Sequence, residues 1–293
     1  MRKTCLRMIY ELAKQDERIV FIGSDLGAGV LDEFKRDMPD RFFMEGVGEA
    51  NMVGMAAGLA LSGKIVYCNT IATFLTRRAF EQVAIDVGLH RANVRLIGNG
   101  GGAVYAPLGP THIATDDIAL MRTIPGMTIL APCDAVDMEQ LMRETAGHRG
   151  PLYIRLGKGG DPKLQWCYRR VEESDVMFIG TGTASQIAFE AADSVGGDFL
   201  HLPRLKPLTI RNIPHHHQSL IVTVEDHSVV GGLGSAVAEC LMETGYPGRL
   251  IRIGYPDVWP HGYGTQDELR ARYGIDVDSI VTRIQKELHG SAR

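Results

Sequence analysis

The stretch GVGEANMVGMAAGLA, residues 46–60, decides the fold of this chain. It has the pattern of a strand end that feeds a helix, and one face of that helix is almost entirely Gly and Ala. Such a face lets another helix approach very closely, as at a tight subunit interface. Glu49 lies in the first turn, where the positive end of the helix dipole favours a carboxylate, so by itself it indicates only a stable helix start.

Short β-rich runs alternate with longer helical segments on both sides of this stretch. That rhythm predicts a parallel, doubly wound sheet. The expected strands are 18–23, 41–47, 64–70, 93–99, 127–131 and 151–156, and the expected helices are 31–38, 49–62, 75–90 and 135–146. Asp134 directly precedes the last of these helices, where its side chain is expected to cap the first turn.

A polar, irregular stretch at 157–173 interrupts the rhythm before a second series begins. Its expected strands are 176–180, 220–225 and 249–253, and its expected helices are 183–195, 233–244, 266–273 and 277–288. The interruption is where a domain boundary is expected. The sequence therefore predicts an α/β protein with two doubly wound sheet domains, 1–164 and a smaller 165–293.

Length and composition narrow the class of protein. A chain of 293 residues with 45% hydrophobic content suits two domains, and its net charge of -4 with scattered Lys and Arg argues against nucleic-acid binding. The first apolar run, 19–22, is too short for a membrane span, so we expect a soluble, cytoplasmic protein. The five cysteines are widely spaced and form no C-x-x-C, so they indicate neither disulfides nor a zinc site. The three consecutive histidines at 215–217 do not indicate a metal site either.

Two further motifs lie downstream of Glu49. TIATFLTRRAFEQV occupies 70–83, and LGPTH at 108–112 is followed by DDIALMRTIPGM at 116–127. Together with 46–60 they resemble the pyrimidine-binding domain of the transketolase family, which includes 1-deoxyxylulose-5-phosphate synthase. EDHSVVGGLG at 225–234 is similar to the signature of that family's C-terminal domain. The resemblance thus covers essentially the whole chain.

This resemblance implies thiamine diphosphate as the cofactor and assigns roles to single residues. Glu49 matches the catalytic glutamate that hydrogen-bonds the aminopyrimidine ring, and Phe74, 25 residues later, matches the aromatic that stacks on this ring. Asp25 matches an Asp that borders the cofactor site, and Arg77 falls in the cofactor-binding stretch. His112 of GPTH would face the substrate carbonyl, where an imidazole can exchange protons near neutral pH.

The substrate-binding positions depart from the usual transketolase pattern. Leu108 stands where the family has an Asp that contacts a donor hydroxyl, and Gly100 stands where a His helps to bind phosphate. Lys158 falls where the family places a phosphate-binding Arg, and its ammonium can meet a phosphate as a point charge. We therefore expect an altered sugar substrate. An anionic group on that substrate, bound by Lys158, is an open alternative.

One half of the family's active site is missing from the sequence. The family holds Mg²⁺ and the diphosphate through a G-D-G…N motif, and the nearest string here, GGDP at 159–162, has Pro in place of the second Gly. The resemblance implies an N-terminal transketolase subunit that carries the diphosphate and Mg²⁺ domain, in an α2β2 heterotetramer. Only with that partner would the chain transfer a two-carbon ketol unit from a ketose to an aldehyde.

Other functions stay open at this point. Within the same chemistry, the chain could be a 1-deoxyxylulose-5-phosphate-synthase-like decarboxylative ligase or the beta subunit of a 2-oxo acid dehydrogenase. Leu108 and Gly100 support a noncatalytic scaffolding paralogue instead. GTGTAS at 180–185 resembles a weakened dinucleotide fingerprint, but it lacks the final Gly or Ala, and a tight strand-to-helix turn is the better interpretation.

Overall fold

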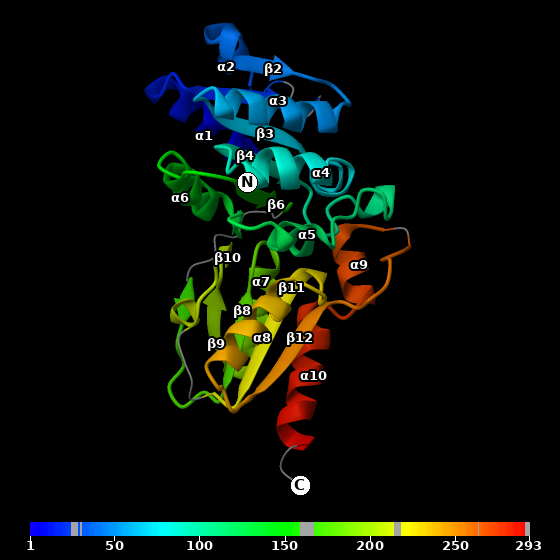
Figure 1. Cartoon of the computed structure of the whole chain (residues 1–293). Coiled ribbons are helices and arrows are strands. Elements are labelled where there is room, and N and C mark those ends of the chain that lie inside the picture. The colour runs from blue at the N-terminus through cyan, green and yellow to red at the C-terminus, as the bar shows by residue number, and fades with distance from the viewer. Residues whose placement is uncertain (25–28, 30, 159–166, 214–217, 263, 291–293) are drawn as a thin grey trace.

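The computed structural model describes residues 1–24, 29, 31–158, 167–213, 218–262 and 264–290 (Figure 1). Its helices and strands form two α/β units, each built on its own sheet, so the predicted fold class is confirmed. Asp25, the GGDP string and the three consecutive histidines lie outside the described residues. Among the residues that are described, no helix is long and apolar enough to cross a lipid bilayer.

The first sheet has seven strands in the order β10-β5-β6-β4-β3-β1-β2. All neighbours are parallel except β10 and β5, which run antiparallel. The strands are β1 (Ile19–Gly23), β2 (Phe42–Met44), β3 (Ile65–Ile71), β4 (Val94–Asn99), β5 (Thr128–Leu130), β6 (Leu152–Leu156) and β10 (Arg204–Lys206). Their side chains are almost all buried, as expected for a sheet covered on both faces.

Helices cover both faces of this sheet. α1, α2 and α6 pack on one face, where Leu6, Phe34 and Met138 join one apolar cluster with the strands. α3, α4 and α5 pack on the other, with Met52 and Ile118 in a second cluster. The bounds are α1 (Arg2–Gln15), α2 (Asp32–Asp37), η1 (Pro39–Arg41), α3 (Glu49–Leu61), α4 (Phe80–Gln82), η4 (Ala106–Leu108), α5 (Asp117–Thr123) and α6 (Ala135–Thr145). Asp134 caps α6 as predicted, because its side chain accepts from the Val136 and Asp137 amides.

The second sheet has five strands in the order β12-β11-β8-β9-β7, with only β7 antiparallel to its neighbour. Here α8 packs on one face and α7, α9 and α10 on the other. The elements are β7 (Tyr168–Arg169), β8 (Val176–Gly180), α7 (Ala184–Val195), β9 (Asp198–His201), η5 (Ile210–Asn212), β11 (Leu220–Ser228), α8 (Leu233–Glu243), β12 (Arg249–Tyr255), α9 (Gln266–Arg272) and α10 (Val277–Gly290).

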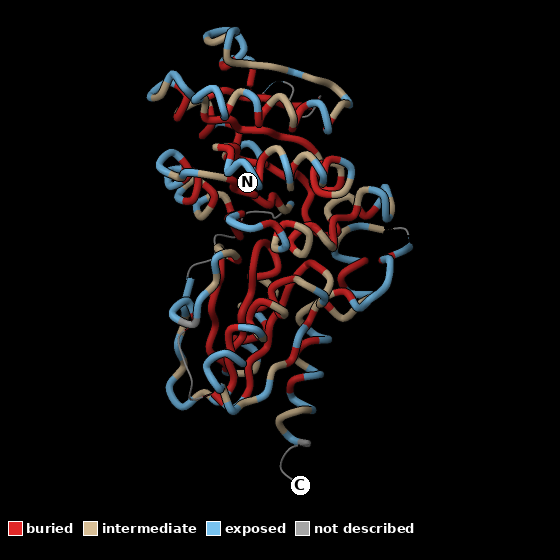
Figure 2. Tube along the Cα trace, viewed as in Figure 1, coloured by how far each residue is buried: buried red, intermediate tan, exposed pale blue. Residues whose placement is uncertain are grey.

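The two sheets are joined by a strand that crosses between them and by a shared apolar cluster. β10 follows the second sheet's β9 in sequence, yet it pairs with β5 of the first sheet. One apolar cluster runs from Met121 and Ile129 of the first part to Met177, Ile179 and other residues of the second. In Figure 2, buried residues lie in both parts of the chain and also where the two parts meet. The junction between the two units is therefore packed interior.

The segment expected as one helix at 75–90 is divided. Two π-helical turns, η2 (Phe74–Arg78) and η3 (Val83–Leu89), flank the short α4. The wider π turn re-aims side chains and is frequent at functional sites. Its effect here is to present Phe74, Arg77 and Arg78 together at the end of β3. α5, β7, β9 and β10 are further elements that the sequence pattern did not predict.

Candidate active site at the carboxyl edge of the first sheet

The candidate residues follow neighbouring parallel strands at one edge of the first sheet. Glu49 comes after β2, Phe74 after β3, His112 after β4 and Lys158 after β6. The carboxyl ends of parallel strands meet at the same edge, which is where open α/β sheets bind ligands. Residues from distant parts of the sequence are therefore gathered into one region, which we call the edge site.

Glu49 is the first residue of α3, and its side chain is only 3% exposed. Gly48 stands at the helix N-cap and offers no side-chain cap, and Glu49 is the acidic residue of the first turn. Arg78 donates from Nη1 to Glu49 Oε2 over 2.9 Å, while the Arg78 side chain remains 50% exposed. A buried acid is thus closed off from solvent by a long, half-exposed arginine side chain.

Phe74 lies between Arg78 and His112. The Arg78 guanidinium carbon is 4.3 Å from the centre of the Phe74 ring, a cation–π contact. The His112 ring meets the Phe74 ring edge-on, with centres 5.1 Å apart and planes at 69°. His112 Nδ1 is also 2.9 Å from the Thr111 hydroxyl. Three of the predicted residues, Glu49, Phe74 and His112, therefore belong to one continuous set of contacts.

Arg77 contacts the GPTH loop and the residues that follow it. Its guanidinium makes a bidentate contact with Asp116, with Nε and Nη2 each 2.8 Å from a carboxylate oxygen. It also donates to the carbonyls of Pro110 and Ile113, both at 3.0 Å. Trp259, from the segment between β12 and α9, lies 5.2 Å from the guanidinium. Arg77 fixes the loop that carries His112, and a residue of the C-terminal domain covers it.

The predicted substrate-binding positions lie further out. Leu108, at the end of η4, is 56% exposed, and Lys158 is exposed just beyond β6. Gly100 adopts a left-handed φ of +80°, and a Cβ there would meet the Tyr105 ring at 2.1 Å. The backbone and Tyr105 together exclude a larger side chain at position 100. Glycine is built into this loop, and its neighbours fill the space that a side chain would need.

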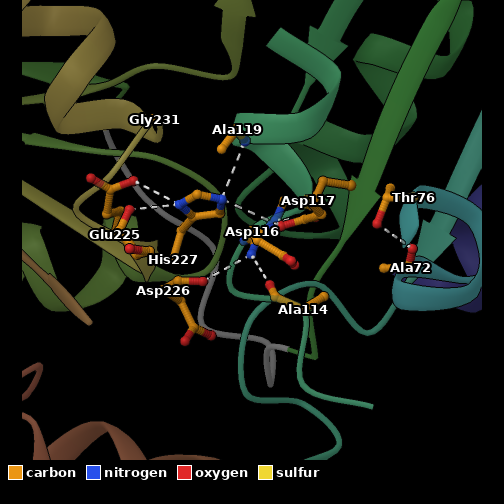
Figure 3. Close-up of polar contacts among 12 residues, drawn as sticks. Ala72, Thr76, Ala114, Asp116, Asp117, Ala119, Glu225, Asp226, His227 and Gly231 are labelled. Carbon is orange, nitrogen blue, oxygen red and sulfur yellow. Dashed lines mark hydrogen bonds and ion pairs between the residues drawn. The ribbon is translucent and has the colours of Figure 1, made fainter. Parts of the chain in front are cut away.

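A network of buried charges, which we call the junction network, lies where the two domains meet, and Figure 3 shows Asp117 and Asp226 from it. Arg155 donates from Nε to Asp117 over 2.8 Å and from Nη2 to the carbonyls of Ala114 and Asp226 at 3.0 and 2.8 Å. Asp226 in turn pairs with Arg270 at 2.6 Å. Asp117 and Arg155 come from the first domain, whereas Asp226 and Arg270 come from the second. The network joins the domains directly under the site.

Two titratable groups in the same region have shifted pKa values. Burial raises the pKa of Glu225 to about 7, although its oxygens accept from the Leu233 and Gly234 amides at 2.6 and 2.8 Å. Burial lowers the pKa of His227. Its Nδ1 lies 2.7 Å from the Ser228 carbonyl and its Nε2 3.4 Å from the Ala119 amide, contacts that suit a neutral ring protonated on Nδ1. Both groups stabilise the junction rather than face the edge site.

The edge site fits one half of thiamine diphosphate. A buried carboxyl group beside an aromatic face can hydrogen-bond and stack an aminopyrimidine. The diphosphate and its metal need hard oxygen ligands. Within the described part of the chain, no group of acidic or His side chains suited to a metal lies at this edge. The chain therefore offers the pyrimidine side of such a site.

Sequence reasoning missed three residues here. Arg78 was present in the quoted motif, but nothing in the sequence separates its role from that of Arg77. Asp116 directly precedes α5 and was not assigned a partner. Trp259 reaches the site from the far end of the chain, beyond β12, so no local pattern could place it.

Comparison with known proteins agrees with this geometry. The family profile "Transketolase, pyrimidine binding domain" matches residues 1–160, and "Transketolase, C-terminal domain" matches residues 167–280. The chain belongs to the transketolase family. The pyrimidine-binding match precedes the C-terminal match along the chain.

Several members of the transketolase family resemble the chain over its full length. The putative transketolase C-terminal section of Methanocaldococcus jannaschii is 34% identical over 98% of this chain and 96% of the relative. An apulose-4-phosphate transketolase subunit of Phocaeicola vulgatus is 33% identical over 95% and 94%. A solved structure titled "Split gene transketolase, inactive beta4 tetramer" superposes with a TM-score of 0.85 at 32% identity, covering 97% of both chains. Transketolases divided between two genes are thus among its relatives.

Proposed function

We propose that this chain is the beta, C-terminal subunit of a thiamine-diphosphate-dependent transketolase that moves a two-carbon ketol unit from a ketose to an aldehyde. The observation that carries the proposal is the buried Glu49 carboxyl group beside the Phe74 ring, at the ligand-binding edge of the sheet. The full-length similarity to transketolase subunits supports it. We also propose the division into domains near residues 164 and 165, with β10 as the strand that crosses back.

When bound, thiamine diphosphate supplies a carbon nucleophile and an electron sink for the transferred unit. Glu49 would hydrogen-bond the aminopyrimidine ring, and Phe74 would hold that ring by stacking. His112 lies against Phe74, where its imidazole can give or take a proton at a substrate oxygen. Arg77 acts by fixing the loop that carries His112.

Arg78 has to move before the cofactor binds. It pairs with Glu49 and covers the Phe74 ring, and these are the two groups that would receive the aminopyrimidine. Since the Arg78 side chain is half exposed, it can turn toward solvent, and a ligand would then take its place beside Glu49, which is only 3% exposed.

The partner is proposed to be an N-terminal transketolase subunit that carries the diphosphate and Mg²⁺ site, in an α2β2 heterotetramer. The described residues at the edge site offer the pyrimidine contacts but no set of oxygen ligands for Mg²⁺. The related split-gene structure is named as an inactive beta4 tetramer. Both observations support a site that two kinds of subunit complete.

The proposed donor is a ketose with an anionic end. Leu108 presents an apolar, exposed side chain where a hydroxyl-binding Asp would be expected, and Gly100 leaves no side chain for phosphate. Lys158, exposed beyond β6, is a cation that the first domain offers at this edge. A single ammonium binds an anion without the bidentate geometry of Arg. We therefore expect broad tolerance of the anionic group.

The test is co-expression with a chain that carries the G-D-G…N motif, followed by ketol-transfer assays on the complex. Glu49→Gln should lower kcat/KM by at least about 100-fold, because the amide cannot provide the same proton control. Glu45→Gln is the matched control, since Glu45 lies near the same loop and its carboxylate accepts a hydrogen bond from Asn51. Equal activity of Glu49→Gln and Glu45→Gln would refute the assignment.

A further inference from the structure

A second cluster of chemically reactive side chains lies at the junction of the two domains, away from the edge site. Cys133 immediately precedes the N-terminus of α6, Asp137 lies in its first turn, and His201 ends β9 of the second sheet. One ligand atom from each lies within 4.8 Å of those of the other two. Cys133 and His201 are buried, and Asp137 is partly buried. Asp137 and His201 are 64 positions apart in the sequence.

The hydrogen bonds of the cluster orient the three side chains toward one another. His201 Nε2 lies 3.0 Å from Asp137 Oδ2, and the same oxygen accepts from the Cys133 backbone amide at 2.9 Å. The other ring nitrogen, Nδ1, lies 2.6 Å from the hydroxyl of Ser185. Metal-binding histidines are held in this way, by a hydrogen bond on the nitrogen that does not bind the metal. Ser185 therefore fixes the His201 ring with Nε2 aimed at the acid.

The three ligand atoms lie within 4.8 Å of one another and would have to adjust to hold a tetrahedral ion. With zinc bonds of about 2.0–2.3 Å, ligand nitrogen and oxygen stand about 3.3 Å apart, and sulfur and nitrogen about 3.6 Å. The observed 3.0 Å between His201 and Asp137 would widen by a few tenths of an ångström. Side-chain rotation is sufficient for such a change.

Charge at the cluster favours a cation. The Asp137 carboxylate is one of the three groups, and Asp134 lies next to Cys133 at the start of the same helix. A bound divalent ion would stabilise the thiolate form of a cysteine ligand.

Cys167 is the nearest further ligand. The register of β7 and β9 pairs Tyr168 with Leu200, which sets Cys167 opposite His201. The Cys167 carbonyl accepts from the His201 amide at 2.7 Å, so the two side chains project from the same face of the strand pair. Its side chain is exposed, which leaves it free to turn toward an ion.

From this geometry we infer that the chain binds one divalent ion of the zinc class through Cys133, Asp137 and His201, with Cys167 in the fourth position. Two ligands come from each domain, so the ion fastens α6 to the β7–β9 pair. A closed site with four protein ligands is structural rather than catalytic. It is separate from the Mg²⁺ proposed for the partner subunit and does not depend on the proposed function.

The test uses the full chain without a histidine tag, with residues 215–217 changed to Asn to remove a competing zinc ligand. After chelator treatment, Zn²⁺ is titrated against a chromophoric chelator. We expect one ion per chain, and at least about 100-fold weaker binding in Cys133→Ser and in His201→Asn, because each removes a ligand. Cys240→Ser and His90→Asn are the matched controls: Cys240 contacts the Leu208 carbonyl and His90 the Ile85 carbonyl, both outside the cluster.

Cobalt substitution gives a second measurement, first on the unmodified chain and then on one variant. Tetrahedral Co²⁺ with thiolate ligands should show intense visible bands and a sulfur-to-cobalt charge-transfer band in the unmodified chain. Cys167→Ser should reduce the charge-transfer intensity, and an unchanged spectrum would remove Cys167 from the site. Absence of stoichiometric Zn²⁺ binding, or a cobalt spectrum without thiolate, would overturn the proposal and leave the cluster as a hydrogen-bonded link between domains.

Discussion

The edge site and the junction network use the same kinds of side chain in opposite ways. In the network, Arg155 and Asp117 are 3% and 0% exposed, and their contacts come from within the chain. At the edge site, Glu49 is equally buried, but its partner Arg78 is half exposed and stands where a ligand is expected. The chain completes the first arrangement by itself and leaves the second for other molecules to complete.

This difference separates stability from activity in the molecule. A buried ion pair is costly to break because one charge is left without compensation. At the edge site the half-exposed Arg78 can turn away, and a ligand can replace it beside the buried Glu49. The two domains are therefore held by contacts that the cofactor does not need to disturb. The following predictions test this separation, from the largest expected effect to the smallest.

Breaking the junction network should destabilise the fold most. In Arg155→Met, Asp117 loses its ion-pair partner in the interior, so the free energy of unfolding should fall by about 3–5 kcal/mol. Urea unfolding measures this. The control is Arg143→Met, whose pair with Glu139 is 64% and 38% exposed and should be worth under about 1 kcal/mol. Equal effects of the two changes would show that burial does not distinguish these pairs.

Stability should also depend on pH through Glu225. Its pKa is raised from 4.5 to about 7 by burial, so the folded state binds the proton more tightly than the unfolded state. Stability from this group is present below pH 4.5 and is lost as pH rises to about 7. The loss is on the order of 3 kcal/mol as an upper figure, at about 1.4 kcal/mol per pKa unit.

Urea unfolding of the unmodified chain and Glu225→Gln from about pH 4.5 to 8 measures this loss. The pKa of His227, 3.7 Å away, is lowered by burial, so its contribution has the opposite sign and is gained as pH rises toward its ordinary 6.5. His227 is present in both proteins, so its contribution cancels to first order in the difference between the unmodified chain and Glu225→Gln. A constant difference between the two proteins across this range would mean that Glu225 does not titrate there.

Loosening the GPTH loop should affect activity more than stability. Arg77→Lys keeps a charge beside Asp116 but cannot make the bidentate contact and both carbonyl contacts together. Misplacement of His112 should lower kcat/KM of the complex by about 10- to 100-fold. Arg143→Lys serves as the exposed control in the same ketol-transfer assay. Unchanged kcat/KM in Arg77→Lys would show that the loop is positioned by other contacts.

The smallest effect is expected for Trp259→Ala. Its ring covers the Arg77 guanidinium at 5.2 Å and is itself 65% exposed. Loss of an exposed cation–π contact should cost about 0.5–1 kcal/mol in urea unfolding. A loss above about 2 kcal/mol would mean that Trp259 has a larger part in joining the domains.

Local sequence signals were sufficient for the sheets and for part of the site. Short apolar runs predicted most parallel strands, because buried strands show near-continuous hydrophobicity. Asp134 was predicted as a cap from its position alone, and the structure confirms it. Glu49, Phe74 and His112 follow strands of one parallel sheet, so the topology brings them to one edge. The prediction that each acts on cofactor or substrate stays a prediction.

Contacts between residues far apart in the chain could not be predicted from the sequence. The short strand β10 leaves the second domain to pair with β5, and no pattern in so short a run indicates its partner. The cluster of Cys133, Asp137 and His201 takes its residues from both domains. Metal sites are recognised in a sequence by close ligand spacing, which these residues lack across the domains. Arg78 was equally hidden, because the sequence does not show which of two adjacent arginines lies over Phe74.

Turnover by this chain, alone and in complex with a subunit carrying the G-D-G…N motif, tests the central claim most directly. The assay is ketol transfer with thiamine diphosphate and Mg²⁺ at saturating concentrations. An edge site that offers only the pyrimidine contacts predicts no turnover by the chain alone and full turnover by the complex. Turnover by the purified chain alone would contradict the account, because one chain would then hold a complete site.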